Sequence, residues 1–474
     1  MNNLRKNFLY NFLYNIVNLI IPLVTAPYVS RIIGSYGIGI NSYVFSISQY
    51  FTLFAMLGLN NYGSRCIAKV RDDKKELSKN FTSIYVFQFL CSILIVMVYL
   101  LFVLLLSKNY KVLFLINILY VLSTVFDINW FFFGVENFKV TVSRNIIIKV
   151  LSTISVFIFV KSYNDLYIYA LIISVSSLLS NIILWPFLLK KVKFVKVKLL
   201  DIKKHIKPNF TLFIPVIAVS IYNIMDKIML GILSTKTQVG LYENSEKIVN
   251  VPVILISAIG TIMLPRISNL VSKKELNKVT EYLKKSIIFS GFLSFPIFFG
   301  ILSVSNIFIP LYLGNEFKSA SILVNILAII IVFKSLALVI RTHYLIPFEE
   351  DKKYIISIIL GACSNFIINL LLISKLNGVG ACVGTVVAEF IVFFYQLYFM
   401  SKKINLKEVY KSILSFLFKS LIMFVFVYLV NFLEFSDLLK SVIKIILGVS
   451  VYGILNINYI KSVLKFKKRK LDEV

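Results

Sequence analysis

Residues 81–106 read FTSIYVFQFLCSILIVMVYLLFVLLL, and none of these side chains is acidic or basic. About 20 apolar residues are enough for a helix to cross the roughly 30 Å hydrocarbon core of a bilayer. This stretch therefore predicts a membrane-spanning helix, and comparable stretches recur along the whole chain. The chain is thus predicted to be an all-α integral membrane protein with about fourteen spans. They are 8–30, 38–60, 81–106, 112–133, 145–161, 165–189, 209–233, 240–264, 286–311, 319–340, 354–374, 378–400, 412–432 and 438–460.

The 51 lysines and arginines are divided unevenly among the connections between these spans. If the N-terminus is cytosolic, the cytosolic segments carry 37 of them, the outer segments 8, and the predicted spans the remaining 6. Short loops rich in Lys and Arg stay on the cytosolic side of a membrane. We therefore expect both termini in the cytosol, with residues 65–80, 190–207 and 266–285 as the main basic cytosolic segments.

The formal net charge of +29 does not indicate nucleic-acid binding, because most of it is loop charge that faces anionic lipid. The N-terminus resembles a signal peptide, but its apolar part is long and a second span follows, which favours an uncleaved helix. The four cysteines have no CxxC or Cys/His spacing, so neither a disulfide nor a metal site is predicted.

The sequence contains none of the common catalytic motifs that we considered. The chain has no phosphate-binding GxxxxGK[ST] loop, no HExxH and no nucleophile elbow, and its two histidines, His205 and His343, stand far apart. The acidic run Glu349–Asp351 fits a solvated loop better than a metal site. With no long loop or soluble domain to hold an active site, we expect a transporter with no cofactor rather than an enzyme.

The chain repeats itself loosely with an offset near 200 residues. Arg31-Ile32-Ile33-Gly34, Tyr36-Gly37 and Asn41-Ser42 in the first half correspond to Lys227–Gly231, Val239-Gly240 and Asn244-Ser245 in the second. Both halves also have a loop in which acid precedes base, Glu136–Lys139 and Glu349–Lys353. This predicts a six-helix lobe at 1–200 and another at 201–400 around a central cavity. Two extra helices and a basic tail follow at 401–474.

Several of these pieces together resemble the Wzx-type polysaccharide repeat-unit flippases. That family belongs to a larger group with the multidrug and toxin extruders and the lipid II flippases. The resemblance covers roughly residues 1–400, and the matching pieces occur in the same order and spacing. They are Arg31-x-x-Gly34-x-Tyr36-Gly37, Gly58 with Arg65, Asp127-x-x-Trp130 through Glu136, Asp226-Lys227-x-Met229-Leu230-Gly231, Val239-Gly240-x-Tyr242 and Leu264-Pro265-Arg266-Ile267-Ser268.

The resemblance implies transport of an undecaprenyl-diphosphate-linked oligosaccharide from the cytosolic to the outer leaflet by alternating access. It also implies a bacterial inner membrane, a role in O-antigen or capsule synthesis, and a polysaccharide polymerase and chain-length protein as partners. Three alternatives stay open: an exporter of drugs or other small molecules, a lipid II flippase, and a polymerase or ligase. An exporter of cations needs an acidic cavity, whereas the unpaired charges here are mostly basic.

Basic residues at membrane depth are the candidates for holding an anionic substrate. A central charge costs roughly 2.5–3.5 kcal/mol to insert, so such residues usually serve a pathway. Arg31, Lys149, Lys334 and Arg341 have no acid within reach along their own helices, so we predict that they bind a diphosphate. Lys419 and Lys444 lie near span ends, where they can reach the headgroups. Two further pairs, Asp226–Lys227 and Glu243–Lys247, fit either a structural salt bridge or a function.

Asparagines form a polar stripe on the first span. Asn7, Asn11, Asn15 and Asn18 are spaced for one helical face, which fits either the lining of a cavity or hydrogen bonds between helices. Lys227 and Lys247 are the other candidates for a polar or paired lining.

A coupling ion, a proton or sodium, would need a carboxylate that is alternately hydrated and buried. The candidates are Asp127, Asp226 and Glu389, and Glu389 is the most isolated of them along the sequence.

Overall fold

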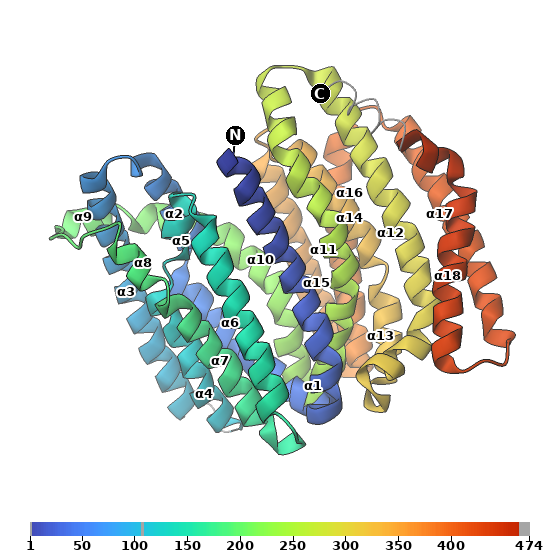
Figure 1. Cartoon of the computed structure of the whole chain (residues 1–474), viewed down its shortest axis with the longest axis horizontal. Coiled ribbons are helices and arrows are strands. Elements are labelled where there is room, and N and C mark those ends of the chain that lie inside the picture. Colours follow the sequence, from blue (N-terminus) through green and yellow to red (C-terminus); the bar gives the residue numbers. More distant parts are fainter. Residues whose placement is uncertain (1, 106–108, 464–474) are drawn as a thin grey trace. The chain divides into compact units, whose positions relative to one another are not determined.

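The structure, a computed structural model, describes residues 2–105 and 109–463, except for the side chains of 2–16, 18, 222, 223, 258, 259, 261 and 262. Throughout these ranges the regular structure is helical, and none of the described residues lies in a strand (Figure 1). The chain divides into two compact units, residues 1–240 and 241–474. The predicted division at residue 200 into two six-helix lobes stays a prediction, because compactness does not by itself identify a repeat.

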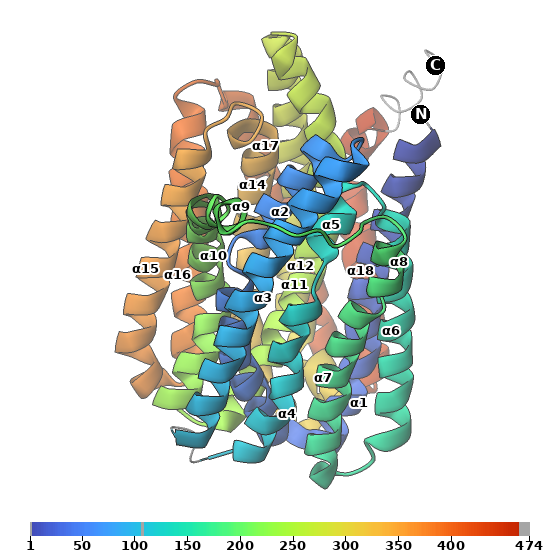
Figure 2. The same cartoon turned by 90° about the vertical axis from the view of Figure 1, so that its left-hand side faces the viewer.

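Unit 1 is built from long helices joined by short turns. α1 packs along α3, α4, α6 and α10, while α4 packs against α7 (Figure 2). The helices are α1 (Asn2–Met56), α2 (Leu59–Val70), α3 (Lys74–Leu105), α4 (Lys111–Leu122), α5 (Asn129–Gly134), α6 (Phe138–Phe159), α7 (Leu166–Ile182), α8 (Trp185–Leu189), α9 (Leu199–Lys203), α10 (Ile206–Leu233) and the start of α11 (Lys236–Ser272).

Unit 2 continues from α11. α12 runs beside both α17 and α18, and α16 packs against α13, α14 and α15 (Figure 1). The helices are α12 (Leu276–Leu313), α13 (Ala320–Leu327), α14 (Ile330–Ile340), a π-helical turn (Arg341–Leu345), α15 (Asp351–Leu376), α16 (Gly378–Ser401), α17 (Lys407–Leu429) and α18 (Asp437–Leu455).

The fourteen-span count is not confirmed. By length and apolarity, 11 helices in the described residues can cross a membrane, or 12 if the bent pair 199–221 and 224–233 is one span. Two features account for the difference. The continuous run Leu19–Val70 counts once, although it contains the end of the first predicted span and all of the second. The eighth predicted span, 240–264, lies in α11 and is not among the candidate spans, which are drawn from the described residues alone; the side chains of its residues 258, 259, 261 and 262 are not described.

Gly34 separates the two predicted spans inside α1. Its backbone angles are φ 73° and ψ 173°, which is not helical. A side chain at this φ would collide with the backbone, so glycine is the residue that permits the break. The glycine of the Arg31-x-x-Gly34 motif therefore marks the boundary that the apolar pattern placed between residues 30 and 38.

The aromatic motif after Asp127 forms a tight helical turn against α2. Trp130 is fully buried, and its ring lies where a Cβ on Gly63 would approach within 2.7 Å. Gly134, at the end of the motif, packs in the same way against Ile67. The two glycines let α2 and α5 meet without intervening side chains, which gives this motif a packing role.

A matching helix end occurs in both units. Glu136 has a left-handed φ of 56°, while the N–H of Asn137 donates to the Phe132 carbonyl at 2.9 Å. Glu349 has the same φ, and the N–H of Glu350 donates to the Leu345 carbonyl at 2.8 Å. This hydrogen-bond pattern is the Schellman motif, whose left-handed position usually holds glycine. The two loops in which acid precedes base thus share one backbone geometry.

Candidate functional site

Two residues predicted for separate roles meet in unit 2. Lys334 lies on α14 and Glu389 on α16, and Nζ of the lysine is 3.3 Å from Oε1 of the glutamate. The glutamate side chain is 4% exposed and the lysine side chain 32%. Lys334 also donates to Oδ1 of Asn250, on α11, at 3.4 Å. The lysine therefore stands between a buried carboxylate and the surface of the unit.

Aromatic residues stand next to both members of this pair along their helices. The ring of Phe333 lies 5.6 Å from that of Phe390, edge to face, and stacks on Phe393 at 5.9 Å. The burial of Glu389 places the pair in a medium of lower dielectric than water, so the attraction between the two charges is stronger there. The same burial makes the carboxylate costly without its cation. Sequence spacing could not reveal the pair, because its members are 55 residues apart on different helices.

Arg341 occupies a different environment from Lys334. It begins a π-helical turn, Arg341–Leu345, and its guanidinium carbon lies 4.3 Å from the ring centre of Tyr354 on α15. π-helical turns are frequent at functional sites. His343, in the same turn, is fully buried, and its Nδ1 lies 2.8 Å from Oγ1 of Thr342. The described residues bring Arg341 onto an aromatic face rather than to an acid.

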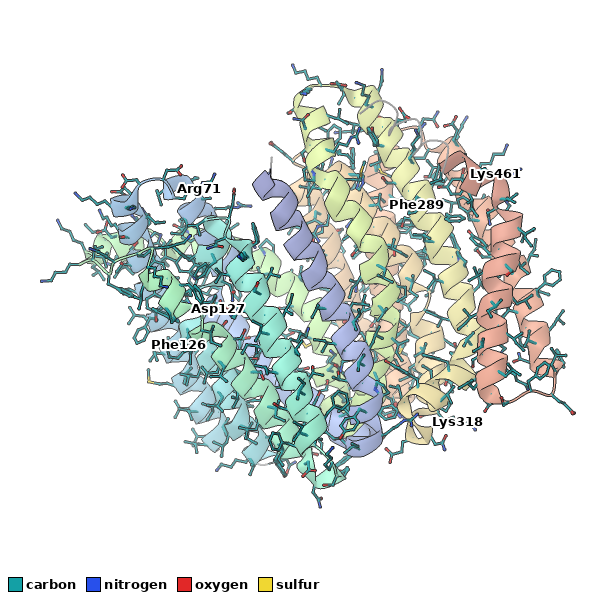
Figure 3. The ribbon with its side chains drawn as sticks, in the orientation of Figure 1. Arg71, Phe126, Asp127, Phe289, Lys318 and Lys461 are labelled. Carbon is teal, nitrogen blue, oxygen red and sulfur yellow. The ribbon has the colours of Figure 1, made fainter. Side chains whose placement is uncertain are left out.

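A second polar cluster, in unit 1, surrounds Asp127 (Figure 3). Oδ1 of Asp127 accepts from both the backbone N–H and the side-chain amide of Asn129, at 3.0 and 2.7 Å. Oδ1 of Asn129 in turn accepts from Arg144 Nη2 at 2.8 Å. Arg144 also donates to the carbonyl of Ser180 and, at 3.4 Å, to Oδ1 of Asn181 on α7. Asn129 thus connects a carboxylate to a buried guanidinium.

Arg144 was not among the predicted site residues, because it lies in the connection just before the predicted span 145–161. The structure places it in α6, where it is 6% exposed. Its acceptors come from α5 and α7, and no linear pattern in the sequence contains them.

Gln88 on α3 holds the turn that carries Asp127. Its side-chain amide donates to the carbonyls of Thr124 and Asp127 at 2.8 and 2.7 Å. Its carbonyl oxygen accepts from Nε1 of Trp130 at 2.8 Å. These three bonds satisfy buried groups at the point where α4 ends and α5 begins, so the backbone around Asp127 is fixed.

We expect Arg144→Lys to destabilise the protein by about 2 kcal/mol, because a lysine cannot reach all three acceptors and leaves buried oxygens without donors. The measurement is the thermal unfolding midpoint of the detergent-solubilised protein. Arg65→Lys, at an exposed position on α2, is the matched control and should unfold like the parent. An unchanged midpoint for Arg144→Lys would show that the network contributes little.

The other predicted site residues lie on α1, α6, α10 and α11. Arg31 is exposed on α1, three residues before the break at Gly34, and Lys149 is half-buried on α6. Asp226 is 3% exposed and Lys227 half-buried on α10. Glu243 and Lys247 form the expected ion pair within α11, at 2.9 Å. The side chains of Asn7, Asn11, Asn15 and Asn18 lie outside the described part of the structure.

Lys444 does not reach the headgroups as its position near a span end suggested. It is 2% exposed, and Nζ donates to the carbonyl of Ser303 at 2.7 Å and to Oδ1 of Asn431 at 2.6 Å. It lines an otherwise apolar cavity of about 560 Å³ between α12, α17 and α18. These oxygen acceptors inside the protein thus take the place of the water that would hydrate a lysine at the membrane surface. Among the described residues no group of three His, Cys, Asp or Glu side chains could hold a metal ion.

The model of the family described as "Polysaccharide biosynthesis protein" matches residues 4–271, which is more than half of the chain. The chain belongs to this family. The resemblance inferred from the motifs is thereby confirmed, and the multi-pass helical architecture agrees with it.

Among curated proteins, a candidate O-antigen transporter of Escherichia coli (strain K12) is 24% identical over 405 residues, covering 84% of this chain and 97% of the relative. A candidate flippase of low-salt glycan biosynthesis from Haloferax volcanii is 29% identical over 195 residues, 40% of each chain. Among solved structures, the lipid II flippase MurJ in an inward closed conformation has a TM-score of 0.78 at 17% identity, covering 96% of this chain and 99% of that one. An inward-facing multidrug transporter of the MATE family has a TM-score of 0.61 at 14% identity, covering 82% and 95%. These two similarities concern the fold.

Proposed function

We propose that this family member is a flippase that moves an undecaprenyl-diphosphate-linked oligosaccharide from the cytosolic to the outer leaflet by alternating access, for surface polysaccharide synthesis. The observation that carries the proposal is the alignment over 97% of a relative named for O-antigen transport, together with family membership. The alignment covers 84% of this chain, so the likeness concerns most of the protein rather than one segment.

The charge at membrane depth supports an anionic substrate. A diphosphate drawn unpaired through hydrocarbon would lose its hydration at a cost of many kcal/mol, so the path must supply donors. The ammonium of Lys334 is partly accessible, and a guanidinium such as that of Arg341 matches phosphate oxygens. Arg31 and Lys149 remain predicted contributors to the same path. The chain would act without covalent chemistry, as a transporter and not an enzyme.

Deleting the gene tests this proposal. Lipid-linked oligosaccharide should then accumulate on the cytosolic side of the membrane, and surface polysaccharide should disappear. Expression of the intact chain should reverse both effects: the lipid-linked oligosaccharide should no longer accumulate, and surface polysaccharide should return. Normal surface polysaccharide in the deletion strain would refute the proposal.

We infer that the protein lies in a bacterial inner membrane with both termini in the cytosol. The support is the excess of lysine and arginine in alternate connections, above all in residues 190–207. A cysteine introduced by Lys196→Cys should resist membrane-impermeant thiol reagents in intact cells and react after permeabilisation. Labelling in intact cells would invert the whole topology.

Coupling to a proton or sodium gradient stays a prediction, with Asp127, Asp226 and Glu389 as the candidate acids. The contact between Lys334 and Glu389 supports a role for the last of them. An arriving anion would compete with Glu389 for the lysine, and a carboxylate that loses its cation while buried favours its protonated form. A polysaccharide polymerase and a chain-length protein are the expected partners.

A further inference from the structure

A basic pocket opens at one end of unit 1, on the side that carries Arg71 (Figure 3). Its volume is about 1140 Å³, and three separate segments form it. These are the turn from α2 into α3, the turn between α5 and α6, and the extended connection between α8 and α9. Six of the lining residues are basic and two are acidic. The basic ones are Arg71, Lys74, Lys75, Lys190, Lys191 and Lys193.

One of the two acids is already neutralised. Oε1 of Glu136 lies 2.7 Å from Nη1 of Arg71, and hydrogen bonding to this carboxylate raises the pKa of the Arg71 guanidinium. Asp72 is the only other acid in the lining, so the pocket keeps a net positive charge of about four. Glu136 has a left-handed φ of 56° at the helix end described above. Such a conformation is unfavourable for a residue with a Cβ, and strain of this kind tends to occur at functional positions.

The wall formed by the α8–α9 connection is fixed rather than loose. Figure 2 shows this segment as an extended run from α8 to α9. Its backbone N–H groups at Lys193 and Val195 donate to Oγ of Ser78 and Oγ1 of Thr82 on α3, at 3.3 and 3.4 Å. Val192 is buried, and the ring of Phe194 stacks on Trp185 with planes 6° apart. The backbone that carries Lys193 is therefore held at several points, directly after Lys190 and Lys191.

Apolar side chains are exposed along the same segment. Leu189 is 58% exposed and Phe194 50%, and Phe187, Val195, Leu199 and Leu200 are exposed as well. A segment that combines lysines with exposed apolar side chains is typical of protein that lies in the interface between headgroups and acyl chains. A pocket for a soluble anion would not need exposed apolar side chains beside it.

We propose that the basic pocket binds a phosphate ester, and that its source is the headgroup of an anionic phospholipid in the leaflet beside it. Basic clusters next to membrane-spanning helices attract such headgroups, each Lys or Arg adding to the affinity. The pocket lies wholly within unit 1, and the inference holds whether or not the proposed transport function is correct. A bound headgroup would fix the three segments to the membrane surface.

The test compares two triple variants of the full-length protein with equal loss of charge. Lys190→Gln/Lys191→Gln/Lys193→Gln removes three positive charges from the pocket wall. Lys196→Gln/Lys198→Gln/Lys203→Gln removes three exposed lysines outside the lining, two from the same connection and one from the end of α9. Binding of phosphatidylglycerol to the detergent-purified protein is measured by native mass spectrometry, with phosphatidylcholine as the neutral lipid. We expect affinity for phosphatidylglycerol to fall on the order of 100-fold in the first variant and less than about fivefold in the second.

An equal loss of affinity for phosphatidylglycerol in the two variants would overturn the proposal. Binding would then depend on the number of positive charges and not on their position in the pocket. Retention of phosphatidylcholine as strong as that of phosphatidylglycerol would also overturn it. A separate arm titrates inorganic phosphate and glycerol 1-phosphate against the lipid-loaded protein. Displacement at concentrations comparable to those of the lipid would keep the phosphate chemistry and assign its source to a soluble ester.

Discussion

Lys334→Met is expected to abolish surface polysaccharide and to destabilise the protein by about 3 kcal/mol. Removing one partner of a buried ion pair leaves the other charge uncompensated, and the Glu389 side chain is 4% exposed. Surface polysaccharide is measured in cells that lack the chromosomal gene, and stability by thermal unfolding of the purified variant. Lys247→Met is the matched control. Its lysine also pairs with a glutamate, at 2.9 Å, but is 44% exposed, so its loss should cost less than about 1 kcal/mol.

The double variant Lys334→Met/Glu389→Gln separates structure from transport. It removes both charges, so the protein should regain most of the lost stability while transport stays absent if Lys334 binds the anion. Lys334→Arg keeps the charge and should retain part of the transport. A double variant that folds and transports normally would show that the pair is structural, and the anion site would then lie elsewhere.

The pair also shows where the sequence stops being informative. Apolar length alone located most of the membrane helices, because bilayer thickness imposes that length on every span. The partners of charged residues depend on which helices pack together. Lys334 and Glu389 were therefore predicted individually, as a cation and an isolated acid, and their contact was not.

Arg144 and Lys444 show a second kind of limit. Both stand near predicted span ends, where an uncertainty of a few residues decides between a hydrated charge and a buried one. In each case acceptors from other helices satisfy the charge: Asn129 and the Ser180 carbonyl for Arg144, and the Ser303 carbonyl for Lys444. A sequence pattern records the charge but not the acceptors.

Gly240, which the sequence repeat aligns with Gly37, makes a close backbone contact in the structure. Its partner is Gly39 on α1, two residues beyond Gly37. Gly39 and Gly240 face each other within unit 1. A Cβ on Gly39 would lie 3.0 Å from the Gly240 nitrogen, and a Cβ on Gly240 would lie 3.0 Å from the Gly39 nitrogen. Small residues that let two helix backbones touch are a general device of membrane proteins.

Gly39→Ala and Gly240→Ala are each expected to destabilise the protein by about 3 kcal/mol or more, and to lower the amount of folded protein in the membrane. The added Cβ of Gly39→Ala would stand 1.6 Å from the Lys236 carbonyl oxygen, and that of Gly240→Ala 2.0 Å from the Ser35 carbonyl oxygen. These neighbours are backbone atoms, which cannot turn aside as a side chain can, so the two helices must separate. Folded protein is measured by size-exclusion chromatography of a fluorescent fusion, and stability by thermal unfolding.

Gly300→Ala and Gly453→Ala are the matched controls, because a Cβ at either position meets nothing within 4 Å. Both glycines lie inside helices, where alanine is favoured over glycine by about 1 kcal/mol, so these variants should be as stable as the parent or more so. Replacing glycine by alanine is thus expected to lower stability where the added Cβ meets backbone atoms, and to maintain or raise stability where it meets nothing. If Gly39→Ala behaves like Gly300→Ala, the close backbone contact between α1 and α11 is not a feature of the folded protein.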